Sequence, residues 1–393
     1  WRKENMKIIS TKTCLYALIA AGVLTLGITQ GAKAETYSGT LYIAGMGGHF
    51  AKADVEIDPS SVTPINLKGL SKVDIGTGVT HPTHDARIDA KNRDLMFWST
   101  YKSDPATNAP HVGATDLKTG KVVMDVSAPI PEKGQKDIKS LYCASGQTEN
   151  FYFPIAMTSK GYIDVFQKSD MKRVASVFLE GTDADPGVPY KFYHGSNSPD
   201  MSKMLISVNE ADTDHGKPVG KIHLLMLDAK ELEKGNVKLI KRGTIPGNAG
   251  KTINFRSTFS PDGKKIALSG ADTMYIVDAE TLTADVSLPM GKLEENHDAM
   301  FTPDGKYVIA TSRTKTLSSG NAKKISMENF GCAEETAAGE LGKDDYLMDG
   351  QVKLYDVAAK KFVGQATSTC LACHNGEGVG EHAVLCGLDA NFK

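Results

Sequence analysis

The sequence contains little of what several large protein classes require. Its 45 basic and 47 acidic side chains leave a net charge of −2, without the basic stripe that nucleic-acid binding needs. It has no P-loop, no G-x-G-x-x-G motif opening a helix and no G-x-S-x-G motif. Sustained 3.6-residue periodicity is also missing outside the N-terminal segment. These absences argue against nucleotide-binding, serine-hydrolase and helical architectures, and we expect no nucleic-acid partner.

Long apolar runs are equally scarce, and the one that exists lies near the N-terminus. It covers residues 14–28, follows two lysines and precedes Ala32-Lys33-Ala34, which has the small-x-small pattern of a cleavage site. We predict a signal peptide over residues 1–34, with residues 1–5 non-native because they precede the first methionine. An uncleaved anchor is the alternative. No later stretch is apolar enough to cross a bilayer, so we expect an exported, periplasmic protein without a membrane span in its mature chain.

Cysteine is rare as well, with six in 393 residues, yet two of them form Cys370-Leu-Ala-Cys373-His374. The C-x-x-C-H pattern tethers c-type haem, because two thiols form thioethers and the adjacent histidine ligates the iron. We predict one covalent haem c in a loop over residues 368–382, with His374 as the metal ligand. A disulfide loop, a zinc half-site or a thiol redox pair is the alternative. The other cysteines of the mature chain are an odd number, so at least one stays free or pairs outside the chain: Cys143, Cys332 and Cys386.

A repeat along the whole chain decides the expected fold. Ser260-Pro-Asp-Gly parallels Thr302-Pro-Asp-Gly, and each joins two short strands through a turn in which proline fixes φ and glycine accepts a positive φ. Four strands recur at a period of roughly 50 to 60 residues, which is typical of β-propeller blades. We therefore predict an all-β chain with one propeller domain over residues 35–393. Five blades are expected at 81–126, 136–178, 190–244, 252–288 and 296–367.

The sixth blade is expected to be split between the two ends of the sequence. Pairing of the N-terminal and C-terminal strands would close the ring and remove two sheet edges. We favour six blades. Seven is the alternative, because the segments 59–80 and 316–347 are long enough to hide strands.

Alignment of the blades on the turn brings one residue of each inner strand to the same rim of the channel. These residues are His84, Tyr142, His194, Arg256, His297 and His382. Five further histidines fall on loops expected at that rim: His49, His81, His111, His215 and His374. Rim imidazoles can bind a metal, ligate a second haem or act as proton donors, and Arg256 would anchor an anion. We take His84, His194, Arg256, His297 and His382 as the candidate catalytic residues. The alternative is that they only cap inner strands.

Two further features belong to the expected haem environment. The sixth iron position is either open or filled by one of several side chains: Met46, His49, His215, Met327 or Met348. The long insertion 316–351 is expected to be a haem cover, a docking element or a solvated loop. Asp85 and Asp298 each follow a rim histidine, but neighbouring strand residues point to opposite faces, so they should not bond their own imidazole.

With repeat, signal segment and haem motif together, the chain resembles bacterial periplasmic propellers. These include YncE-like proteins and the haem-bearing propeller of cytochrome cd nitrite reductase, in which channel-mouth histidines ligate a haem and assist anion reduction. His84, His194, His297 and His382 hold comparable positions here. The chain departs from that enzyme because its C-x-x-C-H motif lies at the far end, without a separate N-terminal cytochrome domain. Propeller subunits of amine dehydrogenases and hydrazine synthase are looser matches.

The leading hypothesis is a periplasmic c-type cytochrome on a β-propeller scaffold. It would transfer electrons to a redox partner protein or to a histidine-lined site at the channel mouth. A small inorganic or amine substrate is the expected class if the chain is an oxidoreductase. One alternative is a non-catalytic subunit of a multihaem oxidoreductase. The other is a haem-free metal-binding propeller.

Overall fold

The chain is almost entirely β-structure. The computed structural model describes residues 35–45, 47–134, 142–158, 160–291, 294–317, 346–369 and 386–393. Within these ranges the only helices are α1 (Ala229–Glu233) and a 3-10 turn (Glu132–Gly134). None of the described helices has the length and apolar character needed to span a membrane. The all-β prediction is confirmed, whereas the predicted signal peptide, the haem motif and His382 lie outside the described residues.

Three sheets contain four strands each, in chain order and antiparallel. The first consists of β4 (Thr83–Ile88), β5 (Leu95–Thr100), β6 (His111–Asp116) and β7 (Lys121–Ser127). The second consists of β8 (Tyr142–Gln147), β9 (Phe151–Ala156), β10 (Tyr162–Gln167) and β11 (Lys172–Phe178). The third consists of β12 (Tyr190–Asn197), β13 (Lys203–Ala211), β14 (Pro218–Asp228) and β15 (Leu239–Pro246).

Two further groups of four strands are joined into one larger sheet through a single residue pair, Ala271 with Asn296. One group is β16 (Thr252–Phe259), β17 (Lys265–Ala271), β18 (Thr273–Asp278) and β19 (Thr283–Pro289). The other is β20 (Glu294–Phe301), β21 (Tyr307–Leu317), β22 (Tyr346–Asp356) and β23 (Lys361–Ser368). The last sheet has the order β24-β1-β2-β3, with β24 (Cys386–Phe392), β1 (Tyr37–Ala44), β2 (His49–Ile57) and β3 (Ile65–Asp74).

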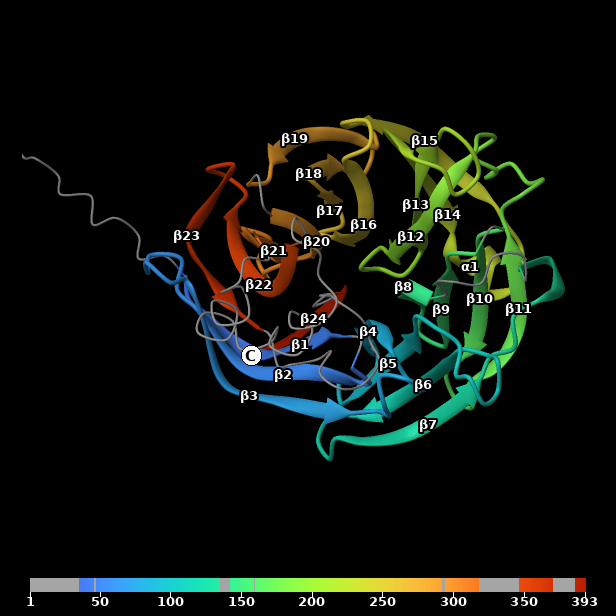
Figure 1. Cartoon of the computed structure of the whole chain (residues 1–393), viewed down its shortest axis with the longest axis horizontal. Helices are drawn as coiled ribbons and strands as arrows, with labels where there is room; N and C mark the ends of the chain where they lie inside the picture. Colours follow the sequence, from blue (N-terminus) through green and yellow to red (C-terminus); the bar gives the residue numbers. More distant parts are fainter. Residues whose placement is uncertain are drawn as a thin grey trace, which may run out of the picture. The chain divides into compact units, whose positions relative to one another are not determined.

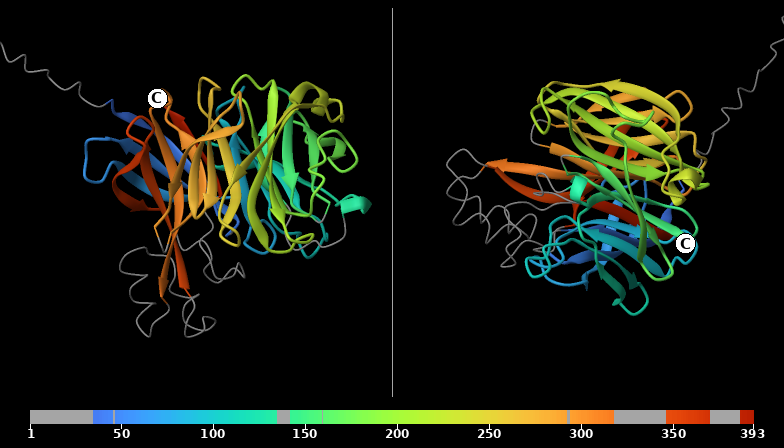
Figure 2. Two further views of the ribbon diagram at one scale, coloured as in Figure 1. Left: turned by 90° about the horizontal axis from the view of Figure 1, so that it is seen from above. Right: turned by 90° about the vertical axis from the view of Figure 1, so that its right-hand side faces the viewer.

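Within residues 35–393 the sheets are arranged radially, as in a β-propeller (Figure 1). The strands nearest the axis are β4, β8, β12, β16, β20 and β24. Each of these inner strands contacts the next in chain order, and β24 contacts β4. Figure 2 shows the same sheets from the side, with their strands running roughly along the axis. This arrangement brings the starts of strands that are far apart in the sequence close together.

The repeated Pro-Asp-Gly turns connect the inner strand to the second strand, as the sequence predicts. In the turn between β16 and β17, the Ser260 hydroxyl donates to Asp262 at 2.7 Å and accepts from the Lys265 N–H at 2.9 Å. Gly263 has φ of +71°, which a residue without a Cβ adopts at little cost. Because the same contacts recur at Thr302 and Asp304, local sequence alone directs the chain to reverse at these points.

Apolar side chains fill the space between neighbouring sheets. One cluster joins β9 and β10 to β13 and β14 through fully buried residues such as Ile155, Val165, Ile206 and Leu225. The outermost strand β7 instead alternates exposed and half-buried residues, as expected for a sheet edge with one solvated face. The apolar core therefore lies between neighbouring sheets. The edge of each sheet that faces the axis carries polar residues.

Candidate functional site

A β-bulge recurs near the start of several inner strands. The register shifts between Thr83 and Asp85 in β4, between Tyr142 and Ala144 in β8, and between Asn296 and Asp298 in β20. The residues inserted at these shifts are His84, Cys143 and His297. A bulge re-aims the extra side chain, and such bulges are frequent next to active sites. The same type of β-bulge therefore sets the direction of three polar side chains.

These residues and His194 of β12 form a buried group that we call the central cluster: His84, Cys143, His194 and His297. The Nδ1 atom of His84 lies 3.0 Å from the Cys143 sulfur. The rings of His84 and His297 are 6.1 Å apart in an edge-to-face arrangement. His194 and Cys143 both act electrostatically on His297. Four strands thus contribute one side chain each to one place.

Aromatic rings surround the central cluster. Phe255 stacks on His297, with ring centroids 4.2 Å apart and an interplanar angle of 11°. Tyr101 lies over His84 at a centroid distance of 4.0 Å. These rings limit access of water to the imidazoles, since His84, His194 and His297 are at most 5% exposed. Three of the predicted site residues, His84, His194 and His297, are therefore brought together in a buried position.

Arg256 lies on the inner strand β16, where its guanidinium is engaged by groups of other strands. Its guanidinium donates two hydrogen bonds to one oxygen of Asp85, at 2.9 and 2.7 Å, and one to the His84 carbonyl at 2.6 Å. Its Nε lies 3.7 Å from Asp298. Tyr152 donates to the other Asp85 oxygen at 2.6 Å. Because these carboxylates compensate its charge, Arg256 positions β4 and β20 rather than serving as an anion anchor.

Tyr142 also differs from the expectation. Its hydroxyl donates a hydrogen bond to Asp164 at 2.5 Å within the second sheet. Burial is the main cause of the raised pKa of Tyr142. The neighbouring residue Cys143 faces His84 instead. Successive strand residues point to opposite faces, so an alignment one position in error selects the wrong side chain. The expectation for Asp85 and Asp298 agrees with the structure, because both carboxylates are engaged by Arg256 or by backbone N–H groups.

The remaining histidines are distributed among loops and strand starts. His49 opens β2, with its Nδ1 atom 3.1 Å from the Gly47 carbonyl oxygen. His215 lies before β14 with a positive φ of 58°. His223 lies inside β14, 2.7 Å from Glu210. His81 and His111 both contact Asp125, a pairing that sequence reasoning did not anticipate because Asp125 belongs to an outer strand.

Among the described residues, one group of three potential ligand atoms lies within 4.8 Å of one another: His81, His111 and Asp125. A second metal or haem at the rim histidines stays a prediction, and His382, one of these histidines, lies outside the described residues.

The protonation state of His297 favours the role of a ligand over that of a proton donor. Burial lowers the pKa of His297 to about 3 from 6.5, opposed by Cys143 and reinforced by His84 and Arg256. The imidazole is therefore neutral at pH 7. Neutral imidazole has a free nitrogen lone pair, which is the form that binds metal ions.

This pKa makes the stability of the protein dependent on pH. Since the pKa of His297 is lower in the folded state, its contribution is intact above pH 6.5 and is lost as pH falls toward 3. We expect His297 to account for about 2 kcal/mol of stability lost between pH 7 and pH 5. In the variant His297→Gln, this loss should shrink by that amount, as measured by urea unfolding at both pH values.

A matched control is His223→Gln, which replaces a histidine whose ring already has Glu210 as its partner. We expect this variant to keep the pH dependence of the parent protein. An equal pH dependence in His297→Gln and the parent would contradict the assignment of a neutral, buried imidazole.

The described ends of the segment that contains the C-x-x-C-H motif can be located relative to the central cluster. Before the motif, the Thr369 N–H donates to the Gly350 carbonyl at 3.1 Å. After it, a Cβ on Gly387 would lie only 2.6 Å from the Ala86 nitrogen, so β24 passes directly against β4. The Leu388 N–H donates to Asp298 at 2.8 Å. The chain therefore leaves the motif segment beside the residues that follow His84 and His297.

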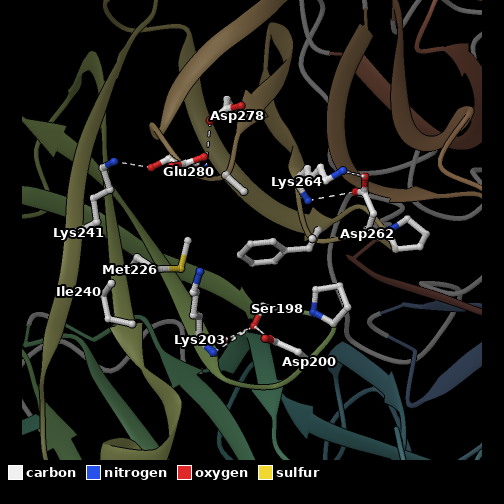
Figure 3. A pocket seen from close by; sticks show the side chains of 15 residues that line it. Ser198, Asp200, Lys203, Met226, Ile240, Lys241, Asp262, Lys264, Asp278 and Glu280 are labelled. Carbon is white, nitrogen blue, oxygen red and sulfur yellow. Dashed lines mark hydrogen bonds and ion pairs between the residues drawn. The ribbon is translucent and has the colours of Figure 1, made fainter.

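A surface groove of about 870 Å³ lies at another place, among the turns of the third and fourth groups of strands (Figure 3). It is lined by turn residues such as Ser198, Asp200, Asp262 and Lys264. Their polar groups are engaged within the turns, for example Ser198 with Asp200 at 2.5 Å. These contacts repeat with the sequence motif, so the groove follows from the turn chemistry and we do not take it as the functional site.

The chain matches no protein-family model and no curated protein sequence. Among solved structures it is similar to a chain of Kuenenia stuttgartiensis hydrazine synthase, with 14% identity and a TM-score of 0.44 over 73% of this chain and 65% of that chain. It thus spans slightly less than two thirds of that chain.

For two other similar solved structures, the match covers a larger share of the neighbour's chain. A functionally unknown protein from Desulfotomaculum acetoxidans has 12% identity and a TM-score of 0.45, over 89% of this chain and 99% of the other. The Cps50 (Swd1) β-propeller domain of Myceliophteria thermophila has 11% identity and a TM-score of 0.39, over 74% and 87%. At these identities and TM-scores, nothing about function is carried over from the neighbours to this chain.

Proposed function

We propose that the protein is a periplasmic c-type cytochrome on a β-propeller scaffold, which transfers electrons to or from a partner protein. The observation that supports this most directly is the connection between β23 and β24. It contains Cys370, Cys373 and His374, and its described end at Gly387 and Leu388 contacts residues adjoining the central cluster. In the sequence, the motif therefore precedes a strand whose start lies beside the central cluster.

The chemistry of the central cluster fits a haem neighbour. Neutral imidazole and thiolate are axial ligands of haem iron, and the cluster offers three imidazoles and one thiol. Phe255 and Tyr101 add flat aromatic surfaces next to them. A buried surrounding of this kind lowers solvent exposure, which is one of the factors that set a reduction potential.

Each residue has a defined part in the proposal. Cys370 and Cys373 would attach the haem and His374 would ligate its iron, while the haem supplies one-electron transfer. Arg256 and Asp85 would hold the backbone at His84 in place through their hydrogen bonds. His374 would hold the iron alone or together with one further imidazole or sulfur side chain of this chain. The redox partner would be a cytochrome or a multihaem enzyme.

The experiment that tests this proposal is secretion of the full chain in a host that matures cytochromes c. The expected product is red, keeps its Soret band after acid–acetone extraction, and has the mass of a chain cleaved before Glu35 plus one haem. The double variant Cys370→Ala/Cys373→Ala should lose the covalent haem completely.

The matched control is Cys143→Ser, which changes a thiol of the central cluster outside the motif. This variant should keep the covalent haem. A colourless parent protein, or haem that is extracted by acid–acetone, would refute covalent attachment. A colourless product would favour the haem-free, metal-binding propeller of the alternative hypothesis.

Kinetic measurements separate the leading hypothesis from that of a non-catalytic subunit. Turnover of a small inorganic or amine substrate by the isolated holoprotein would assign it as an oxidoreductase. Absence of turnover, together with tight co-purification with a multihaem protein, would assign it as a non-catalytic subunit. Its haem would then carry electrons to or from that multihaem protein.

We also propose a finer description of the fold. The six groups of four strands would be six blades, and pairing of β24 with β1 would close the ring. The register that supports this runs from Gly39 with Phe392 to Ala44 with Cys386. A single ring of this kind predicts one cooperative unfolding transition over residues 35–393.

A further inference from the structure

A second group of polar side chains lies in the first sheet, apart from the central cluster. His81 lies two residues before the start of β4, His111 is the first residue of β6, and Asp125 lies in β7. We call these three residues the His81–His111–Asp125 cluster. They are separated by up to 44 positions in the sequence, and pairing of β6 with β7 brings His111 opposite Ser127, two residues from Asp125.

The ring nitrogens converge on the two oxygens of one carboxylate. The His81 Nε2 atom lies 3.1 Å from Asp125 Oδ2, and the His111 Nδ1 atom lies 2.7 Å from Asp125 Oδ1. All three potential ligand atoms lie within 4.8 Å of one another. In a tetrahedral zinc site, ligand atoms about 2.1 Å from the ion are separated by about 3.4 Å. The limit of 4.8 Å on the observed separations exceeds this value by little more than 1 Å, so side-chain shifts of that order would admit an ion.

The outer ring nitrogens have partners that would orient both histidines. The His81 Nδ1 atom lies 2.8 Å from the Thr80 hydroxyl oxygen. The His111 Nε2 atom lies 3.4 Å from Asp104 Oδ2 and is buried without a well-aligned hydrogen bond. Histidine ligands of metals usually direct their second nitrogen to a carboxylate, carbonyl or water. Asp104 and Thr80 can serve this purpose.

The surroundings combine a sheltered site with one open side. The His81 and His111 side chains are only 11% and 12% exposed, while that of Asp125 is 34% exposed. The indole of Trp98 meets the ring of His81 edge to face at 5.6 Å. The imidazoles are thus held by packing, and an ion could reach them from the side of Asp125.

We propose that His81, His111 and Asp125 bind one divalent transition-metal ion of the zinc class. Two imidazoles and one carboxylate provide three ligands, which leaves a fourth position for water or a further ligand. The ion would fix the segment before β4, three residues from His84, to the third and fourth strands of the same sheet. This site is independent of the haem motif, so its existence does not depend on the proposed function.

The competing interpretation is that His81 and His111 form ion pairs with Asp125 and that no metal binds there. Hydrogen bonding to Asp125 raises the pKa of His111, so this ring would then be a cation that neutralises the carboxylate. The two interpretations differ in their response to added zinc, because an imidazolium has no lone pair for a metal.

The test is equilibrium dialysis of the secreted full-length protein against zinc chloride at pH 8, followed by metal analysis and by calorimetric titration. We expect one zinc ion per chain at this site. The variants Asp125→Asn and His111→Gln should each bind it at least tenfold more weakly. Circular dichroism and thermal unfolding of each variant would verify that it is folded.

Two control variants locate the ion. His223→Gln removes a histidine whose ring contacts the carboxylate of Glu210, and Cys143→Ser removes the thiol of the central cluster. Both should bind zinc as the parent protein does. Absence of zinc binding by the parent, or unchanged affinity in a folded Asp125→Asn, would overturn the proposal. Zinc lost from Cys143→Ser but not from Asp125→Asn would place the ion in the central cluster instead, which would also overturn it.

Discussion

Replacement of Arg256 with methionine is expected to lower the free energy of unfolding by about 3 to 5 kcal/mol. The guanidinium is fully buried and is the partner of Asp85, while Asp298 lies 3.7 Å from its Nε. Without it, two buried carboxylates keep their negative charge or must take up protons. Burial already raises the pKa of Asp298, and Arg256 counteracts this effect.

Urea unfolding of the holoprotein would measure this loss, and the double variant Arg256→Met/Asp85→Asn should recover part of it. Lys68→Met is a suitable control, because its ion pair with Glu56 lies on the surface with both side chains more than half exposed. It should leave the urea midpoint nearly unchanged. A similar, small effect of Arg256→Met would show that the central ion pairs do not hold the inner strands together.

Replacement of Gly387 with alanine is the second change for which we expect a large loss of stability. Gly387 has φ of +68°, and a Cβ there would lie 2.6 Å from the backbone nitrogen of Ala86. The clash is with backbone rather than with a side chain that could move. Two losses of stability add together. One is backbone strain of about 1 to 2 kcal/mol, and the other comes from displacement of β24 from β4. We expect a total loss above about 3 kcal/mol, measured by urea unfolding.

Gly120→Ala provides the matched control for the backbone strain alone. Gly120 has nearly the same φ, +70°, but nothing lies within 4 Å of the position of its Cβ. The difference between the two variants therefore reports the contact between β24 and β4. Equal losses in both variants would mean that this contact contributes nothing, and would argue against closure of the ring at β24.

The repeated turn is the part of the fold that the sequence predicts best. Hydroxyl, carboxylate and glycine occur at fixed positions around Asp262 and Asp304, and their contacts are local. A pattern of this kind can be identified without any knowledge of distant residues. The strand order within each group of four then follows from short connections.

The central cluster could be predicted only in part. His84, His194 and His297 are marked by their place before the turn, but Cys143 was overlooked in favour of Tyr142. The register of the bulge decides between these neighbours, and it depends on pairing with the next strand. The partners of Arg256 come from β4 in another sheet and from β20 in the neighbouring group of strands, so no local pattern indicates them. The same holds for Asp125, which meets His81 only after folding.

Pairing of β24 with β1 has a consequence for biogenesis. In the secreted cytochrome proposed above, β1 would lack this partner until β24, the last of the described strands, had emerged. The two motif cysteines precede β24 in the sequence, so maturation enzymes would meet them before the sheet of β24, β1, β2 and β3 is complete. We expect the proposed haem attachment to precede completion of this sheet.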